Sequence, residues 1–311
     1  MKFARKSLLA SAALAALCFG AAGQAHADAF AQSILTINNF RLLHADGTPF
    51  TPADFDLLDG VNSAHARASL NGVSAVATPQ DFSILSGNNP DVPHQFVGLP
   101  NPPRAENTFT PFASPPGLPG TFGYADQNLT GSALSVGGGP AGATAQTRAD
   151  ASLMSDGSAS GDSDVGTSTT FSFTLGAAGS MTFAFDATPF TQAYTTNGAT
   201  TNAIARLSWS LNIIDQTTGA LVYVFQPGEL NGDANASRTG TFPGLTTYNP
   251  GTLSFSAISP LLNATDVYQL TVQHNTLANA LQTTAAVPEP GTLAMFGLGL
   301  LGMTAFKRRR R

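Results

Sequence analysis

Apolar and polar residues alternate along several short segments in the second half of the chain. Residues 170–175 and 180–187 each place three large apolar side chains on one face. Because side chains alternate across a strand, this period of two predicts two half-buried β-strands. The small residues at 176–179 lie between them, and the three segments together predict a β-hairpin.

The same alternation continues towards the C-terminus. Residues 205–215 and 220–225 flank a short polar turn at 216–219 and predict a second hairpin. Helical periodicity is poor in this part of the chain. We therefore expect an all-β body, built as an antiparallel β-sandwich or a jelly-roll-like fold. Further strands are expected at residues 34–43, 65–70, 253–258 and 267–272.

Two features of the first half complete this prediction. Residues 86–120 hold nine prolines, a density that excludes a helix or a central strand. We expect a long irregular surface loop there, separating an N-terminal portion from the rest. Residues 65–72 weakly resemble residues 147–157, which suggests two comparable strands of a sheet rich in small residues.

Charge is distributed unevenly along the chain. Residues 28–287 contain six arginines, no lysine and 18 acidic residues, so this body has a formal net charge of −12. Nucleic-acid binding requires clustered cations, and the acidic composition of the body argues against it. The only cysteine is Cys18, which lies in the segment described next. The mature body should therefore have no thiol for a disulfide, a metal site or catalysis.

The N-terminus has the three parts of a secretory signal peptide. Cations at residues 2–6 precede an apolar run at residues 8–19. Ala25 and Ala27 then fit the small-x-small rule for cleavage by signal peptidase, which makes Asp28 the expected first residue of the mature protein. We expect residues 1–27 to form a signal helix that is removed on export.

The C-terminus also has three parts. Residues 287–290 are Val-Pro-Glu-Pro, and the next sixteen residues, 291–306, carry no charge. As a helix this run would be roughly 24 Å long, about 6 Å short of a bilayer core, and thinning of the bilayer can cover that difference. We expect a short transmembrane helix there. The chain closes on cations that would stay on the cytoplasmic side, namely Lys307, Arg308, Arg309, Arg310 and Arg311.

This order of parts resembles the PEP-CTERM sorting signal of Gram-negative bacteria. The resemblance covers residues 287–311 and implies that a membrane-embedded exosortase processes the chain and releases or attaches its body at the cell surface. It further implies that Pro288, Glu289 and Pro290 are the recognition element. Residues 291–306 would hold the substrate transiently in the inner membrane, and the basic tail would fix its orientation.

Weak candidates for a calcium site lie in the body. Asp162 and Asp164 are separated by one serine, and alternating oxygen ligands of this kind occur in calcium loops. Neither candidate segment has the remaining ligands of a full loop, and Asp, Asn and Gly also populate turns for backbone reasons. The second candidate segment consists of Asn231, Asp233 and Asn235.

Signals for a hydrolase are weaker still. Gly161-Asp162-Ser163 and an Asp91-x-x-His94 pair resemble blocks of one esterase class, but their order along the chain is reversed. A third candidate, the carboxylate cluster at residues 54–59, lacks the aromatic platforms usual beside a sugar-cleaving pair. The histidines have no metal-ligand spacing. We therefore expect no catalytic residue and no cofactor other than calcium.

These observations favour a non-enzymatic protein of the cell surface or the extracellular matrix, delivered by the exosortase route. By resemblance, its role would lie in a biofilm or exopolysaccharide matrix, with exopolysaccharide as a partner. The alternative is a secreted carbohydrate-binding β-sandwich module, which would need aromatic residues on a concave face. A secreted hydrolase is the third class.

Overall fold

The computed structural model describes residues 28–283, except residues 114, 116, 118, 166–168 and 198–200. This part of the chain forms one compact unit of antiparallel β-strands with three short 3₁₀ turns. The predicted signal helix and the predicted C-terminal helix both lie outside the described residues. Within the described ranges, none of the helical segments has the length and apolar character needed to cross a bilayer.

The first sheet has seven strands. They are β1 (Ala29–Leu43), β5 (Gln95–Gly98), β6 (Phe122–Thr130), β7 (Ala143–Leu153), β10 (Thr182–Thr195), β14 (Gly244–Tyr248) and β15 (Leu253–Ile258). Their order is β14–β10–β1–β7–β6–β5, and β15 pairs with β10 beyond β14. We call this the seven-stranded sheet.

The second sheet has nine strands. They are β2 (Phe55–Leu70), β3 (Val73–Val76), β4 (Gln80–Ser83), β8 (Gly157–Val165), β9 (Thr169–Leu175), β11 (Asn202–Asp215), β12 (Ala220–Phe225), β13 (Ala236–Thr239) and β16 (Tyr268–Gln282). Their order is β12–β11–β16–β8–β2–β3. Three further strands lie outside this order: β13 pairs with β11, β4 pairs with β2, and β9 pairs with both β16 and β2. The 3₁₀ turns are η1 (Pro52–Asp54), η2 (Gly228–Leu230) and η3 (Gly232–Ala234).

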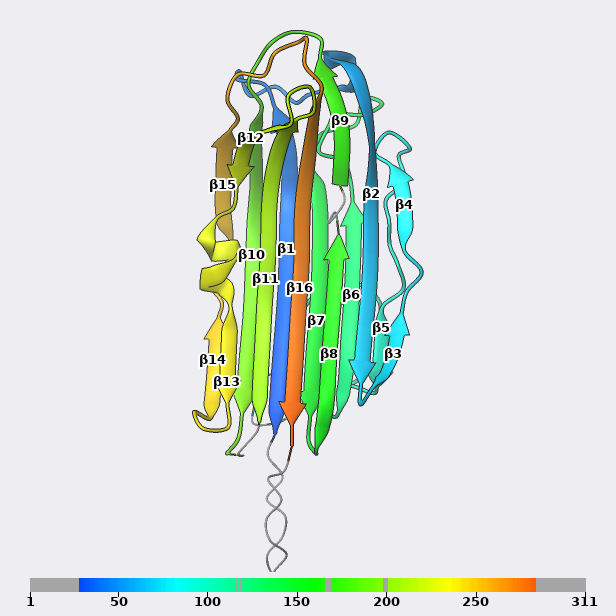
Figure 1. Cartoon of the computed structure of the whole chain (residues 1–311). Helices are drawn as coiled ribbons and strands as arrows, with labels where there is room; N and C mark the ends of the chain where they lie inside the picture. The colour runs from blue at the N-terminus through cyan, green and yellow to red at the C-terminus, as the bar shows by residue number, and fades with distance from the viewer. Residues whose placement is uncertain are drawn as a thin grey trace, which may run out of the picture. The chain divides into compact units, whose positions relative to one another are not determined.

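The two sheets pack face to face as a sandwich. Figure 1 looks through both layers, and β1 contacts β11 and β16 of the other sheet while β7 contacts β8. The first strand begins and the last strand ends at the same end of this body, where Ala29 and Ala280 belong to one buried cluster. The predicted antiparallel β-sandwich is confirmed.

Large aromatic side chains fill one half of the space between the sheets. Trp209 of β11 packs against Phe185 of β10 with ring centroids 4.6 Å apart, and Phe55, Phe173 and Tyr268 continue the contacts. These residues alternate with polar ones along their strands, so the period of two in the sequence marks the inward face. Burial of this apolar area supplies the main stabilisation of this half.

Small residues fill the other half. Alanines from seven strands make up most of the buried cluster there, including Ala151 of β7 and Ala278 of β16. Gly123 of β6 and Gly161 of β8 let the two sheets come closer still. A methyl group on Gly161 would lie 2.0 Å from the carbonyl oxygen of Tyr124, and one on Gly123 would lie 2.3 Å from that of Ser160. The small residues therefore set a short distance between the sheets.

A buried polar contact lies between these sheets as well. The Nε2 atom of His274 on β16 lies 3.0 Å from Oγ1 of Thr147 on β7, and both side chains are buried. Nearby, Ser163 of β8 donates a hydrogen bond to the carbonyl oxygen of Asp126 on β6. These hydrogen bonds link the two sheets directly, in addition to the apolar packing.

The proline-rich segment contains one short strand, β5, at the edge of the seven-stranded sheet. The described residues within 99–121, which we call the covering segment, pass over the outer face of this sheet. Phe112 lies there against Phe30 and Phe122, and the hydroxyl of Ser152 donates to the carbonyl oxygen of Gly120. The strands before and after the segment belong to the same two sheets, so it does not divide the body into two portions.

The structure confirms the predicted strands and extends most of them. The hairpin joining β11 and β12 is confirmed, with β11 residues 211–215 paired to β12. The hairpin predicted for residues 170–187 is wrong, because β9 pairs with β2 and β16 while β10 pairs with β1, β14 and β15. The chain instead crosses from one sheet to the other at residues 176–181, so both apolar faces meet in the aromatic core.

The two weakly similar segments both form strands with their alanines inward. Residues 65–70 belong to β2, and residues 147–153 belong to β7. The strands lie in different sheets, which corrects the prediction that they share one.

Candidate functional site

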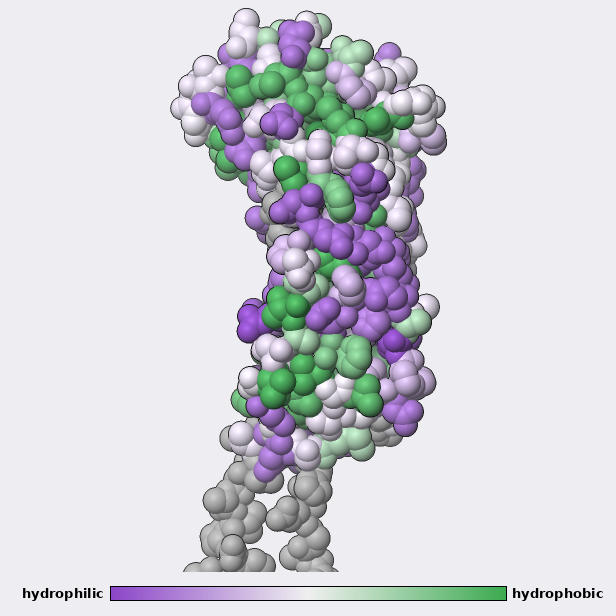
Figure 2. All heavy atoms as spheres, turned by 90° about the vertical axis from the view of Figure 1, so that its right-hand side faces the viewer, coloured by the Kyte–Doolittle hydropathy of each residue, from purple (hydrophilic) through white to green (hydrophobic). Residues whose placement is uncertain are grey.

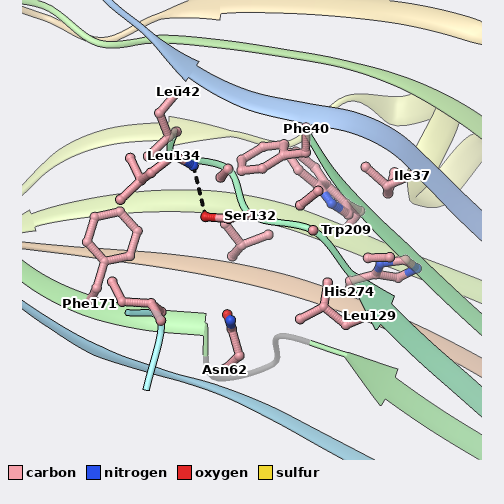
Figure 3. Close-up of a pocket in the computed structure, with 16 residues that line it drawn as sticks. Ile37, Phe40, Leu42, Asn62, Leu129, Ser132, Leu134, Phe171, Trp209 and His274 are labelled. Carbon is pink, nitrogen blue, oxygen red and sulfur yellow. Dashed lines mark hydrogen bonds between the residues drawn. The ribbon is translucent and has the colours of Figure 1, made fainter. Parts of the chain in front are cut away.

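A cavity of about 80 Å³ lies between the sheets at the edge of the aromatic core (Figure 3). Its walls are mainly apolar and include Phe40, Leu134, Phe171 and Trp209. The side chain of Ser132 points into the same region and accepts a hydrogen bond of 3.2 Å from the backbone N–H of Leu134.

Only one of the sixteen lining side chains is ionisable, that of His274. It is buried and lies within hydrogen-bond distance of Thr147. General acid–base chemistry needs a positioned proton donor or acceptor, usually with a partner that orients it beside substrate. A cavity with these walls suits a small apolar group and offers little to a hydrolytic reaction.

A second group of polar residues lies between the covering segment and the seven-stranded sheet. The Nε atom of Arg148 donates a hydrogen bond of 2.6 Å to Asp150, and both side chains are fully buried. Gln32 on β1 donates to the other oxygen of Asp150 at 2.7 Å. Burial raises the pKa of Asp150, and the charge of Arg148 and these hydrogen bonds oppose that rise.

Arg148 also holds the covering segment in place. Its Nη1 atom donates to the carbonyl oxygens of Thr108 and Thr110, at 2.9 and 2.6 Å. The ring of Phe112 lies close to two guanidinium groups, 3.9 Å from that of Arg104 and 4.8 Å from that of Arg148. Such cation–π contacts strengthen when water is excluded. The buried charges therefore tether the segment to the sheet.

An acidic group lies on the neighbouring strand. The hydroxyl of Tyr124 donates to Asp126 at 3.0 Å, and the N–H of Gln127 donates to its other oxygen. Burial raises the pKa of Asp126 to about 7, and the charge of Glu106 contributes to the rise. His94 bonds to Glu106 through its ring and its backbone N–H, and its ring stacks on Tyr124.

The contacts of this second group are those of a network that holds the structure together. Arg148 binds Asp150 and the covering segment, and Asp126 accepts hydrogen bonds from neighbouring residues of its own strand. A raised carboxylate pKa is a feature of many catalytic sites, but ion-pair networks that hold a structure together produce it as well. The geometry of this group fits an ion-pair network that holds the covering segment to the sheet.

The calcium candidates lie in two different settings. Asp162 and Asp164 belong to strand β8 rather than to a loop, and Asp162 accepts a hydrogen bond from Asn275. Asn231 joins the β12–β13 connection to β11, because its amide donates to the carbonyl oxygens of Trp209 and Pro227. Across the described residues, no three His, Cys, Asp or Glu side chains are grouped to hold a metal ion. Asp233 and Asn235 lie in and just after η3.

The structure also separates the residues that resembled an esterase. Ser163 is buried between the sheets, where its hydroxyl donates to the carbonyl oxygen of Asp126. His94 lies on the outer side, paired with Glu106. Of the carboxylates at residues 54–59, Asp54 binds Thr51 at the start of η1 and lies 3.4 Å from His44. Its role there is to cap a turn.

The buried charges were not singled out by the sequence patterns. Arg148 and Asp150 alternate with alanines along β7, which would be typical of a strand with one solvent-facing side. The only available sign was the nearby proline-rich segment, which is long enough to cover that side.

The predicted sorting residues, Pro288 to Pro290, the signal cleavage residues and the basic tail lie outside the described residues, except for Asp28. Neither a curated protein nor a solved structure matches the chain. A family model described as the PEP-CTERM protein-sorting motif matches residues 286–311, and such a motif implies export and processing by exosortase. The C-terminal region of this chain is therefore a PEP-CTERM protein-sorting motif.

Proposed function

We propose that this chain is a non-enzymatic protein of the cell surface or extracellular matrix. The observation that carries the proposal is the sorting motif at residues 286–311, which directs a protein towards exosortase. Signal peptidase would first remove residues 1–27. The body would then remain as a β-sandwich associated with a biofilm or with exopolysaccharide.

The polar groups of the body support a structural role. The buried ion pair of Arg148 and Asp150 and the cluster around Asp126 join the covering segment to a sheet. The cavity beside Trp209 has apolar walls. These arrangements stabilise a sandwich, and they supply neither a paired nucleophile and base nor paired carboxylates beside an open cleft.

A carbohydrate-binding module has less support. Sugar rings stack on exposed aromatic faces, but the aromatic rings of this body gather mainly between the sheets and under the covering segment. Of the large apolar side chains that are exposed in the described residues, only Phe96 and Phe242 are aromatic. Phe96 also packs beside His94. No specific observation therefore favours this alternative.

The sorting proposal is tested in a Gram-negative host that has an exosortase. In one variant Pro288, Glu289 and Pro290 are all replaced by alanine, which keeps the apolar run and the basic tail intact. We expect the unchanged chain to be shortened at its C-terminus and to reach the cell surface. The variant should keep its C-terminal segment and remain with the inner membrane.

Two controls accompany this test. Glu229→Ala changes a glutamate in the body and should leave processing unchanged, while a host without exosortase should treat the natural chain as it treats the triple variant. If the triple variant is shortened and distributed like the natural chain, the sorting proposal is wrong. The matrix role is tested separately, by comparing the biofilm mass of cells with and without the protein.

A further inference from the structure

A long uncharged stretch forms one edge of the seven-stranded sheet. Residues 239–265 contain no Asp, Glu, Lys or Arg, in a body with a net charge of −12. This stretch includes both β14 and β15, which lie end to end along β10. The longest stretch of the body without a charged residue therefore lies at a sheet edge.

The strand β15 has one partner strand in the described structure. Residues 253–258 pair with residues 182–187 of β10 in an unbroken register. Its other side therefore carries backbone N–H and C=O groups without a strand to pair with, and such an edge is a template for another strand. Proteins usually protect an edge with lysine, an internal proline or a bulge. None of these occurs within Leu253–Ile258.

The other edges of the sandwich differ from this one. At the end of the nine-stranded sheet, β12 has a register shift opposite Ile213 and Ile214. The edge formed by β3, β4 and β5 carries charges nearby, including Asp81, Asp91 and Glu106. Figure 2 faces this edge and shows a hydrophilic band across its middle.

Exposed apolar side chains accompany the uncharged edge. Ile258 at the end of β15 is 62% exposed, and Leu261 just beyond it is 67% exposed. Phe242, which precedes β14, is 74% exposed. Single exposed apolar residues are common, but Ile258 and Leu261 lie at the end of a strand with one unpaired side, within the same charge-free stretch. The stretch combines hydrogen-bonding capacity with apolar surface.

From these observations we propose that β15 pairs with β15 of a second copy of this chain, as an antiparallel extension of the seven-stranded sheet. Two acidic bodies repel each other over most of their surface, and this stretch lets two backbones approach without opposing like charges. A two-fold interface brings the same patch of each copy together. The two β15 strands would pair so that the side chains on their outer faces lie opposite each other. Ser256, which lies near the middle of the strand, is then at the two-fold axis or next to it.

The pairing is tested on the full chain, purified in detergent from a host without exosortase, so that the result does not depend on sorting. Cys18→Ser removes the natural cysteine, and Ser256→Cys then places one thiol at the centre of β15. We expect oxidation to give a disulfide-linked dimer. Val73→Cys is the matched control, because Val73 is 61% exposed on edge strand β3, and it should stay mainly monomeric.

A second measurement uses sedimentation of the chain over a range of concentrations. Ser256→Lys together with Ile258→Lys places like charges across the pair and should weaken self-association by about tenfold or more. Val73→Lys with Val76→Lys should leave it unchanged. A chain that is monomeric at every concentration would overturn the proposal, and so would association that only the β3 lysines weaken. Circular dichroism checks that each variant keeps its β-structure.

Discussion

Arg148 and Asp150 are two residues apart on β7 and form an ion pair of 2.6 Å with both side chains fully buried. They project from the outer face of the sheet, yet the covering segment shields them from water. Removing one partner of such a pair leaves the other charged and buried, which costs more than the pair contributes when intact. The consequences of this arrangement can be measured.

Asp150→Ala should lower the free energy of unfolding by about 3–5 kcal/mol, because Arg148 would keep its charge without a carboxylate partner. Urea unfolding followed by fluorescence of Trp209 measures the change. Replacing both residues, with Arg148→Met and Asp150→Leu, should cost less than Asp150→Ala alone. Asp56→Ala removes an exposed carboxylate and should change stability by less than about 0.5 kcal/mol. Equal effects of Asp150→Ala and Asp56→Ala would contradict the tethering role.

The stability of the body should depend on pH through Asp126. Its pKa in the folded state is about 7, whereas an unfolded chain has a value of about 4 for aspartate. Between these values the folded state keeps a proton that the unfolded state has lost. The free energy of unfolding should therefore fall as pH rises from 4 to 7, by at most about 1.4 kcal/mol per pH unit, and level off above 7.

Asp126→Asn isolates this contribution, because the amide keeps a similar shape and does not titrate. The difference in stability between the natural chain and this variant, measured by urea unfolding from pH 4 to pH 8, should vary with pH in the direction given above. A difference that stays constant over this range would show that Asp126 is not protonated in the folded protein at neutral pH.

Close approach of the two sheets predicts a severe effect of a small substitution. Gly161→Ala would place a methyl group 2.0 Å from the carbonyl oxygen of Tyr124, and backbone cannot move aside cheaply. We expect a loss of about 3 kcal/mol or more in unfolding free energy. Gly232→Ala is the control, since nothing lies within 4 Å of the added carbon. Thermal unfolding compares the two, and a tolerated Gly161→Ala would mean that the sheets are further apart.

The aromatic half of the core should instead be sensitive to the removal of a large side chain. Phe185→Ala removes a ring that packs against Trp209 and Phe255, and it should cost about 3–5 kcal/mol. Phe242→Ala removes a ring that is 74% exposed and should change stability by less than about 0.5 kcal/mol. Denaturant unfolding distinguishes them. Similar losses for both would place Phe242 in a buried environment.

The sequence predicted the strands better than their partners. Phe171, Phe173 and Phe185 alternate with polar residues, so the inward faces of β9 and β10 were evident. Alternation does not say which sheet a strand joins. The turn at residues 176–179 is equally compatible with a hairpin and with a crossing between two layers, and only the long-range pairing of β9 with β2 distinguishes them.

The strands with few large apolar residues were harder to predict. β6 and β8 have few large apolar residues, and Gly161 and Ser163 in β8 give no clear period of two. Their inward faces are buried because the opposite sheet is close, and this closeness results from small residues in both sheets together. A local pattern cannot contain that information. The burial of Arg148 is a similar case, because it depends on a segment about forty residues earlier in the chain.

The two ends of the body have a consequence for processing. β1 begins and β16 ends at the same end of the sandwich. Each of these strands has 15 residues and therefore extends for roughly 50 Å. Cleavage by two different proteases, before β1 and after β16, would thus alter a single pole of the molecule. The far pole, with the loop after β1 and the turn between β11 and β12, would be the same before and after maturation.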